Sequence, residues 1–267
     1  MTLNHIPEHF KYNVHPKDLK IQFDEKDHSY FIDEEKIKYS VSQIINKFFP
    51  VFDSQHWSRV KAIEKLDESG LIYVEEDILR EQNVLLEQWE LKRTESSQKG
   101  LILHELIEKY YNKESFENTP QEFNYFLEFI FKYPKLKPYR TEWRVYNDEL
   151  TLAGTIDMVY EKDNGELFLF DWKRSTKIVN ATGLLIQSDF KYGFDQLSHV
   201  ADNSFNKYAL QQNLYKFILE EYYGKKISSM NLLVLHPNYH TFFHVSIPEM
   251  KKETEFLINQ SIEKSIQ

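Results

Sequence analysis

The sequence predicts a fold of the α/β class, in which helices and strands are mixed along the chain. Two strands are expected at about residues 150–161 and 167–170, because the Asn164-Gly165 pair between them is a strong hairpin signal. The second segment, LFLF, is apolar throughout, as expected of a central strand that is covered on both faces. Residues 121–132 have the apolar spacing of an amphipathic helix, which we expect to pack on the sheet.

The N-terminal part of the chain predicts a small hairpin followed by helices. Apolar and polar residues alternate within 19–38, which indicates two short strands. A helix follows that is capped by Ser40 or Ser42 and ends before Pro50. Residues 54–97 have helical spacing and carry many charges, which predicts further helix.

The rest of the chain predicts a second set of helices and strands. In chain order they are a helix at 100–111, a loop at 132–140, a strand at 141–146, a loop insertion at 178–207, a helix at 208–223 that ends at Gly224, strands at 230–236 and 241–247, and a C-terminal helix at 249–266. We therefore divide the chain into an N-terminal hairpin and helical cap region, 1–97, and a core, 98–267.

Composition and charge exclude several classes of protein. The 267-residue chain has no cysteine, which excludes disulfides, thiolate zinc sites and cysteine-bound iron–sulfur clusters. A hydrophobic content of 41%, with no apolar run long enough to cross a bilayer, predicts a soluble, intracellular protein without membrane contact, cytoplasmic if the source is prokaryotic or viral. The net charge of −9 argues against a protein that coats DNA non-specifically, but not against an enzyme with a local basic groove.

Three charged residues are expected to meet at one end of the predicted hairpin. Folding the hairpin brings Asp157 opposite Asp171, within one residue of register, and Lys173 lies on the same face as Asp171. Two neighbouring carboxylates are costly unless a cation lies between them, and oxygen ligands of this kind suit Mg²⁺ or Mn²⁺. The lysine can orient a metal-activated water or neutralise charge on a phosphate. The alternative is that both acids are ordinary strand-end residues near a turn.

The order of Asp157 followed by Asp171-x-Lys173 resembles the PD-(D/E)XK nuclease superfamily. Three further motifs follow the family order and together resemble its RecB-type exonuclease branch: Gly100-xxx-His104, Gly154-xx-Asp157 and Gln211-xxx-Tyr215. The segment DWKRSTK at 171–177 is similar to the corresponding segment of the mitochondrial genome maintenance exonucleases. The resemblance covers about residues 95–247. It implies a restriction-endonuclease-like core, which is a mixed β-sheet flanked by helices, with a helical N-terminal region.

The resemblance also implies roles for individual residues. His104, Asp157, Asp171 and the backbone carbonyl of Trp172 would hold one or two Mg²⁺ or Mn²⁺ ions. Lys173 would position the attacking water. Glu142 is a further catalytic candidate, and the alternative role for it is pairing with Arg144 or a lysine across the strands. The residues expected to support the site or to contact the substrate are Gly100, which lets backbone approach closely, Gln211, Tyr215, and the run of Arg174, Ser175 and Lys177.

The function that the resemblance implies is a metal-dependent DNA exonuclease that acts on single-stranded ends, in DNA replication, recombination or repair. A helicase or recombination protein is an expected partner, because the sequence has no helicase motif of its own. The absence of cysteine separates the chain from the iron–sulfur members of the branch. Two alternatives stay open: a restriction-type or structure-specific endonuclease, and a non-catalytic nucleic-acid-binding subunit of a larger complex.

Overall fold

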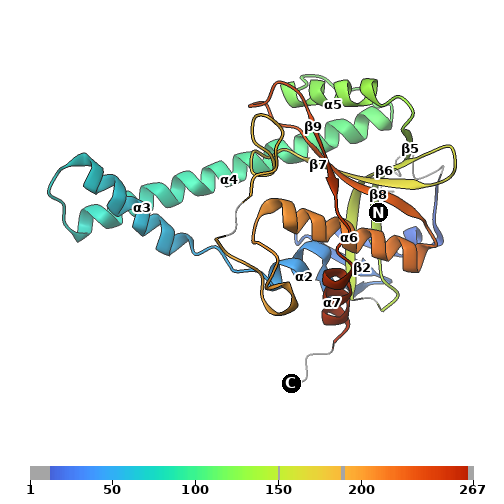
Figure 1. The fold of residues 1–267 in the computed structure, drawn as a ribbon, viewed down its shortest axis with the longest axis horizontal. Helices are drawn as coiled ribbons and strands as arrows, with labels where there is room; N and C mark the ends of the chain where they lie inside the picture. Colours follow the sequence, from blue (N-terminus) through green and yellow to red (C-terminus); the bar gives the residue numbers. More distant parts are fainter. Residues whose placement is uncertain (1–12, 150, 188–189, 264–267) are drawn as a thin grey trace. The chain divides into compact units, whose positions relative to one another are not determined.

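The computed structural model describes residues 13–149, 151–187 and 190–263, and Figure 1 shows the path of the chain. The chain divides into two compact units. One comprises Val51–Ile102, and the other comprises the described residues up to Pro50 together with those from Leu103 onward. This division differs from the one expected at residue 97, because the N-terminal hairpin and the helix that follows it contribute to the core of the larger unit.

The larger unit is built around a mixed sheet of six strands. The strands are β4 (Tyr39–Ser40), β5 (Lys137–Tyr146), β6 (Leu152–Glu161), β7 (Leu167–Lys173), β8 (Ile227–Val234) and β9 (Phe243–Ile247). Their order is β4-β6-β7-β8-β9, with β5 also paired to β6. The β4–β6 and β7–β8 pairs are parallel and the others are antiparallel. The antiparallel β6–β7 pair confirms the predicted hairpin, and Gly165 in its turn has a φ of 78°, which glycine adopts without steric cost.

Each face of this sheet has its own core, because successive residues of a strand point to opposite faces. Leu167 and Leu169 pack with α2 (Val41–Lys47), α6 (Ser204–Tyr223) and α7 (Lys251–Ile262). Phe168 and Phe170 pack with α5 (Gln121–Lys132) and with the last turns of α4 (Glu75–Tyr111). The predicted α/β class is therefore confirmed, with a mixed sheet flanked by helices.

The predicted N-terminal hairpin is confirmed, and a short segment before it is tied to the large sheet. The hairpin consists of β1 (Ile21–Asp24) and β2 (Ser29–Ile32), to which β3 (Glu35–Lys36) adds a third strand. In the preceding helix η1 (Pro16–Leu19), Asp18 accepts hydrogen bonds from Arg140 Nη1 at 2.6 Å and from Trp143 Nε1 at 3.2 Å. This buried ion pair fixes the backbone around Arg140. The loop predicted at 132–140 is therefore wrong over its last residues, where β5 has already begun.

Two helices begin earlier than the sequence predicts. α6 begins at Ser204 because Asn203 caps it, accepting a hydrogen bond from the Asn206 N–H at 2.8 Å. α4 is one continuous helix, so the start expected at Gly100 is wrong. A glycine inside a helix, such as Gly100, lowers the stability of the helix by about 1 kcal/mol relative to alanine, which is too little to end it. The predicted end of α6 at Gly224 is confirmed by its φ of 60°.

The smaller unit contains α3 (Ser54–Ser69) and the part of α4 up to Ile102. Asp53 caps α3 by accepting a hydrogen bond from the His56 N–H at 2.9 Å, and Gly70 ends it in the left-handed conformation. A bidentate ion pair between Arg59 and Glu75 joins the two helices, with distances of 2.6 and 2.9 Å. The helical pattern predicted for 54–97 is confirmed.

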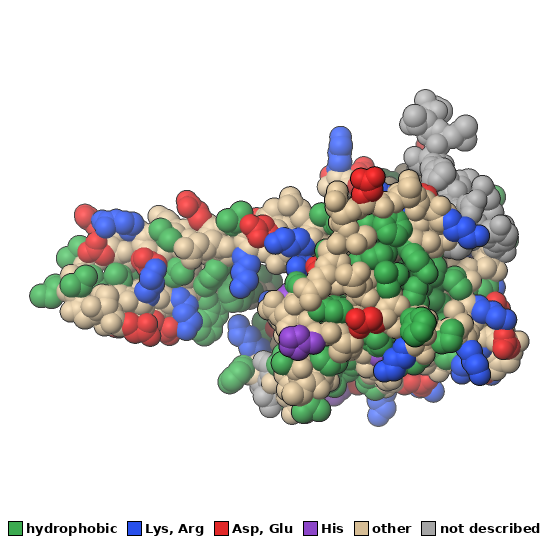
Figure 2. Space-filling view, turned by 90° about the horizontal axis from the view of Figure 1, so that it is seen from above, with side chains coloured by type: hydrophobic (Ala, Val, Ile, Leu, Met, Phe, Trp, Pro, Cys, Tyr) green, Lys and Arg blue, Asp and Glu red, His purple; other side chains and the backbone are tan. Residues whose placement is uncertain are grey.

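Two further features are the hydropathy of the helices and the distribution of charge on one face of the molecule. Among the described residues, every helix is either too short or too polar to cross a bilayer. On the face drawn in Figure 2, lysine and arginine side chains are interspersed with aspartate and glutamate. Such a distribution favours local over general attraction of a polyanion.

Candidate metal centre

The β6–β7 hairpin opens at the two acids that the sequence singles out. Its pairing runs from Glu161↔Leu167 to Met158↔Phe170 and stops there. The next pair in the same register would be Asp157 and Asp171, as predicted. Instead, the Trp172 N–H donates to Asp157 Oδ2 at 2.9 Å. The strands therefore part where the carboxylates lie, and a backbone donor fixes one of them.

His104 approaches the same point from α4. Its Nε2 donates a hydrogen bond to the Trp172 carbonyl at 2.9 Å, and its Nδ1 lies 3.5 Å from Asp157 Oδ2. Because a carbonyl only accepts hydrogen bonds, the neutral ring has its proton on Nε2 and its lone pair on Nδ1. The free lone pair is thus directed toward Asp157. The role of the Trp172 carbonyl as a metal ligand stays a prediction, since in this structure the carbonyl accepts a hydrogen bond from the imidazole.

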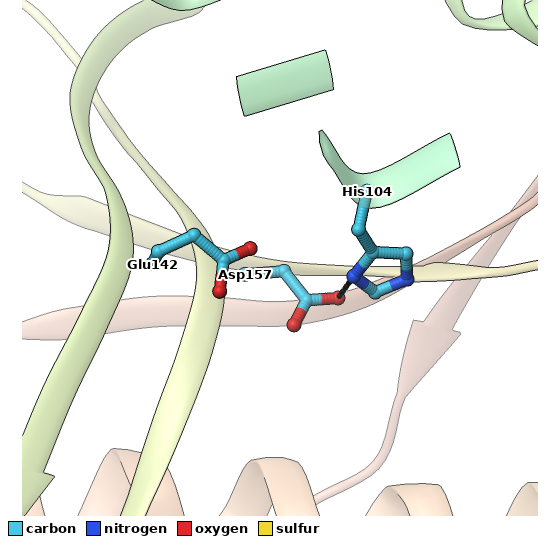
Figure 3. Close-up of side chains that lie close together, drawn as sticks. All are labelled: His104, Glu142 and Asp157. Atoms are coloured by element: carbon cyan, nitrogen blue, oxygen red, sulfur yellow. Dashed lines mark ion pairs between the residues drawn. The ribbon is translucent and has the colours of Figure 1, made fainter. Parts of the chain in front are cut away.

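Glu142 completes a group of three possible metal ligands. One ligand atom from each of His104, Glu142 and Asp157 lies within 4.8 Å of the others, and Figure 3 shows the three side chains close together. Glu142 lies in β5, at the register position opposite Asp157. Its backbone has a φ of 45°, a left-handed conformation that costs a non-glycine residue roughly 1–2 kcal/mol. Strain of this kind, held at a cluster of ligands, favours a functional over an incidental role for Glu142.

Asp171 and Lys173 form an ion pair beside this group. Lys173 Nζ lies 2.5 Å from Asp171 Oδ2, and its ammonium also lies 4.4 Å from the ring centroid of Tyr208. Asp171 is only 1% exposed, and its Oδ1 has no hydrogen-bond partner among the described residues. A buried carboxylate oxygen without a partner is costly, and a cation could satisfy it. Asp171 is not part of the three-ligand group, so its predicted role as a ligand stays a prediction.

Burial and neighbouring acids raise the pKa of two carboxylic acids of the site, Asp171 and Glu142. Burial, then the charge of Asp157, raises the pKa of Asp171 to about 6, although Lys173 opposes the shift. Burial and Asp157 likewise raise the pKa of Glu142 well above its usual range. Burial alone would lower the pKa of Lys173, but Asp171 and Asp157 outweigh it and raise that pKa. The lysine is therefore held as an ammonium, and the carboxylates repel one another.

The Gln211-xxx-Tyr215 motif supports the strand that carries Asp157. Gln211 Nε2 donates to the Tyr215 hydroxyl at 3.1 Å, and the tyrosine ring lies against Gly154. A Cβ added at Gly154 would lie 2.6 Å from Tyr215 Cε1 and 2.9 Å from its hydroxyl oxygen. Two of the sequence motifs are therefore in contact, and the glycine that allows close approach is Gly154.

We expect Gly154→Ala to lower the free energy of unfolding by about 1–3 kcal/mol, the usual cost of overpacking a buried contact. Gly100→Ala is the matched control, because among the described residues no atom lies within 4 Å of a Cβ built there. That change should stabilise the helix by roughly 0.5–1 kcal/mol. Urea unfolding followed by circular dichroism measures both. Equal stability of the Gly154 variant and the wild type would contradict the contact.

The remaining predicted residues are divided between the site and the surrounding structure. The open space at Gly100 does not support its expected role in close backbone approach. Arg174 Nε lies 2.5 Å from Glu122 Oε1 in an ion pair whose side chains are 11% and 6% exposed, so its charge is already compensated. Ser175 Oγ accepts a hydrogen bond from the Lys177 N–H at 3.1 Å, and the Lys177 side chain is exposed. Lys177 is therefore the member of this run that is open to a phosphate.

Two residues of the site were not expected from the sequence. One is Tyr208, whose ring contacts the Lys173 ammonium. Tyr208 lies three residues before Gln211 and therefore on the same helix face, and this spacing could have indicated that it belongs to the site. The other is Glu122, which forms an ion pair with Arg174. An acid beside the apolar stripe of the helix at 121–132 could have indicated a buried partner for a cation.

Comparison with known proteins adds little to this geometry. No family model matches the chain, and no curated protein matches it. Among solved structures the chain is similar to one described as "Crystal structure of SSO0001", with a TM-score of 0.34 and 14% sequence identity, over 85% of this chain and 77% of that chain. What the fold and the site define together is an α/β protein with a candidate metal centre of one histidine and two or three acids, beside a lysine.

Proposed function

We propose that this protein is a divalent-metal-dependent nuclease that hydrolyses phosphodiester bonds in DNA, at single-stranded ends. The observation that carries the proposal is the convergence of His104, Glu142 and Asp157 on one point, next to the Asp171–Lys173 ion pair. The sequence motifs that resemble the RecB-type nucleases supply four of these five residues. The preference for single-stranded ends comes from that resemblance.

The donor set fits Mg²⁺ or Mn²⁺. Carboxylate oxygens suit both ions, and an imidazole ligand makes Mn²⁺ the better match. His104, Glu142 and Asp157 would hold the ion, and the unpartnered Oδ1 of Asp171 is available as a further ligand. When bound, the ion would supply a Lewis acid and an activated water at neutral pH.

The protein's own groups orient the site and balance its charge. The Trp172 N–H holds Asp157, and the Trp172 carbonyl holds the His104 ring, so one peptide segment of β7 aligns two candidate ligands. Lys173, held between Asp171 and the Tyr208 ring, can donate to a phosphate oxygen as negative charge develops on it. A protonated amine cannot act as a general base, so its role is charge stabilisation or orientation of the attacking water.

Incubation with end-labelled single-stranded and duplex DNA, linear and circular, tests the proposal. We expect linear single strands to be degraded with Mn²⁺ or Mg²⁺, and no degradation with EDTA. Circular DNA should survive; cutting of circles would instead indicate an endonuclease. Binding without cleavage under every metal condition would overturn the assignment and leave a nucleic-acid-binding module.

A further inference from the structure

A cavity of about 250 Å³ lies between α2 and α6, and Tyr208 in its lining contacts Lys173. Ser42, Ile45 and Asn46 line it from α2, and Lys207, Tyr208 and Gln211 line it from α6. Ser42 is three and four positions before the other two residues of α2, and Gln211 is four and three positions after the other two of α6, so each set belongs to one face of its helix. The cavity is thus a groove formed by two facing helices.

The groove adjoins the candidate metal centre through shared side chains. Tyr208 lines the cavity, and its ring also makes a cation–π contact with the Lys173 ammonium, which lies 4.4 Å from the ring centroid. Gln211 lines the cavity and also donates to the hydroxyl of Tyr215, which packs on the strand of Asp157. A group seated in the groove would therefore lie one side chain away from the reacting phosphate of the proposed function.

The lining favours a neutral planar ring over a phosphate. Lys207, the cation of the lining, is already paired with Asp202 at 2.7 Å and lies 4.9 Å from the ring centroid of Phe49. The side-chain amide of Asn46 and the Oε1 of Gln211 have no hydrogen bond among the described residues, and Asn46 is exposed. Amide side chains match the donor and acceptor pattern of nucleobase edges, and an aromatic ring provides a stacking surface.

The size of the groove restricts what it can hold. Its volume of about 250 Å³ lies just below the roughly 300–1,000 Å³ that is usual for sites of drug-sized ligands. A volume below that range suits one small planar group, such as a single base. We propose that the groove between α2 and α6 takes one unpaired nucleobase of the strand being cut, next to the scissile phosphate. This inference rests on the proposed function and gives its single-strand preference a structural cause.

Binding can be tested without cleavage. The probe is a set of single-stranded oligonucleotides, each with the fluorescent base 2-aminopurine at one position, mixed with the protein and Ca²⁺ in place of Mn²⁺. We expect stacking to quench the fluorescence at one position near the end of the strand. Asn46→Leu places a larger side chain without an aromatic ring at this exposed position of the groove, and should remove this quenching. Lys47→Gln, the neighbouring exposed residue outside the lining, should keep it. Quenching that is equal at all positions, or that survives in Asn46→Leu, would overturn the proposal.

A cleavage assay separates this inference from the proposed function. Replacing the base at the quenched position by an abasic residue should slow cleavage by the wild type roughly tenfold, the scale of one base stacked on an aromatic ring. The same replacement should have no effect on cleavage by Asn46→Leu, whose fold is checked by its Mn²⁺-induced rise in melting temperature. Cleavage that is insensitive to the abasic residue in both proteins overturns the groove alone. Position-specific quenching without any cleavage supports the groove and overturns the nuclease.

Discussion

Asp157→Asn is expected to abolish DNA cleavage and also to raise the melting temperature of the metal-free protein. The loss should be at least about a thousandfold, because a metal ligand contributes several kcal/mol to charge stabilisation in the transition state. The gain in stability has a separate cause. The charge of Asp157 raises the pKa of both Glu142 and Asp171, which means that the folded protein holds repelling carboxylates together. Removing one charge should relieve on the order of 1 kcal/mol, the free energy of one pKa unit.

The asparagine keeps the local structure, because its side-chain oxygen can still accept from the Trp172 N–H. Melting in EDTA and in Mn²⁺ measures both effects. The wild type should gain stability in Mn²⁺ by binding the ion only when folded, and the variant should not. Asp163→Asn is the control, since Asp163 lies in the turn of the same hairpin and is exposed. An Mn²⁺ response in Asp157→Asn equal to that of the wild type would contradict the assigned centre.

The sequence predicts the relative positions of His104, Asp157 and Asp171 better than it predicts the bounds of the helices. The register of the hairpin follows from Asn164-Gly165 and from the apolar run after it, so the positions of Asp157 and Asp171 could be inferred. His104 converges with Asp157 as expected, although the helix that carries it extends far beyond the predicted start. A motif constrains a few residues locally, whereas a helix boundary depends on packing that a single segment does not encode.

Other features depend on partners that are distant in the sequence. Arg174 looks like a free cation in the run after Lys173, but tertiary structure brings Glu122 to it and compensates its charge. Glu142 could be named as a candidate, whereas its left-handed backbone has no signature in the residues beside it. Asp171 was expected to share a metal with His104 and Asp157. In the structure it forms an ion pair with Lys173, two residues away, and it lies outside the three-ligand group.

Lys173→Met is expected to abolish cleavage and to destabilise the protein, because it leaves the Asp171 carboxylate buried without its cation. Breaking a buried ion pair from one side costs about 3–5 kcal/mol. The loss of stability in Lys173→Met should grow as the pH rises. The pKa of Asp171 is already about 6, above its ordinary value of 3.8, and losing the lysine raises it further. Between the ordinary pKa of 3.8 and the raised pKa, the folded variant binds more protons than the unfolded chain. Its stability therefore falls as the pH rises from about 4 through 6, and levels off once the pH exceeds the raised pKa.

Double replacement separates the structural role of the pair from its chemical role. Asp171→Asn combined with Lys173→Met removes both charges, and replacing a whole buried pair by neutral groups of similar volume is often close to neutral. We therefore expect the double variant to recover most of the lost stability and none of the activity. Lys162→Met, an exposed lysine of the same hairpin, controls for the substitution itself. If the double variant unfolds as readily as Lys173→Met, then the destabilisation does not come from an uncompensated Asp171. If it cleaves DNA, the lysine is not part of the chemistry.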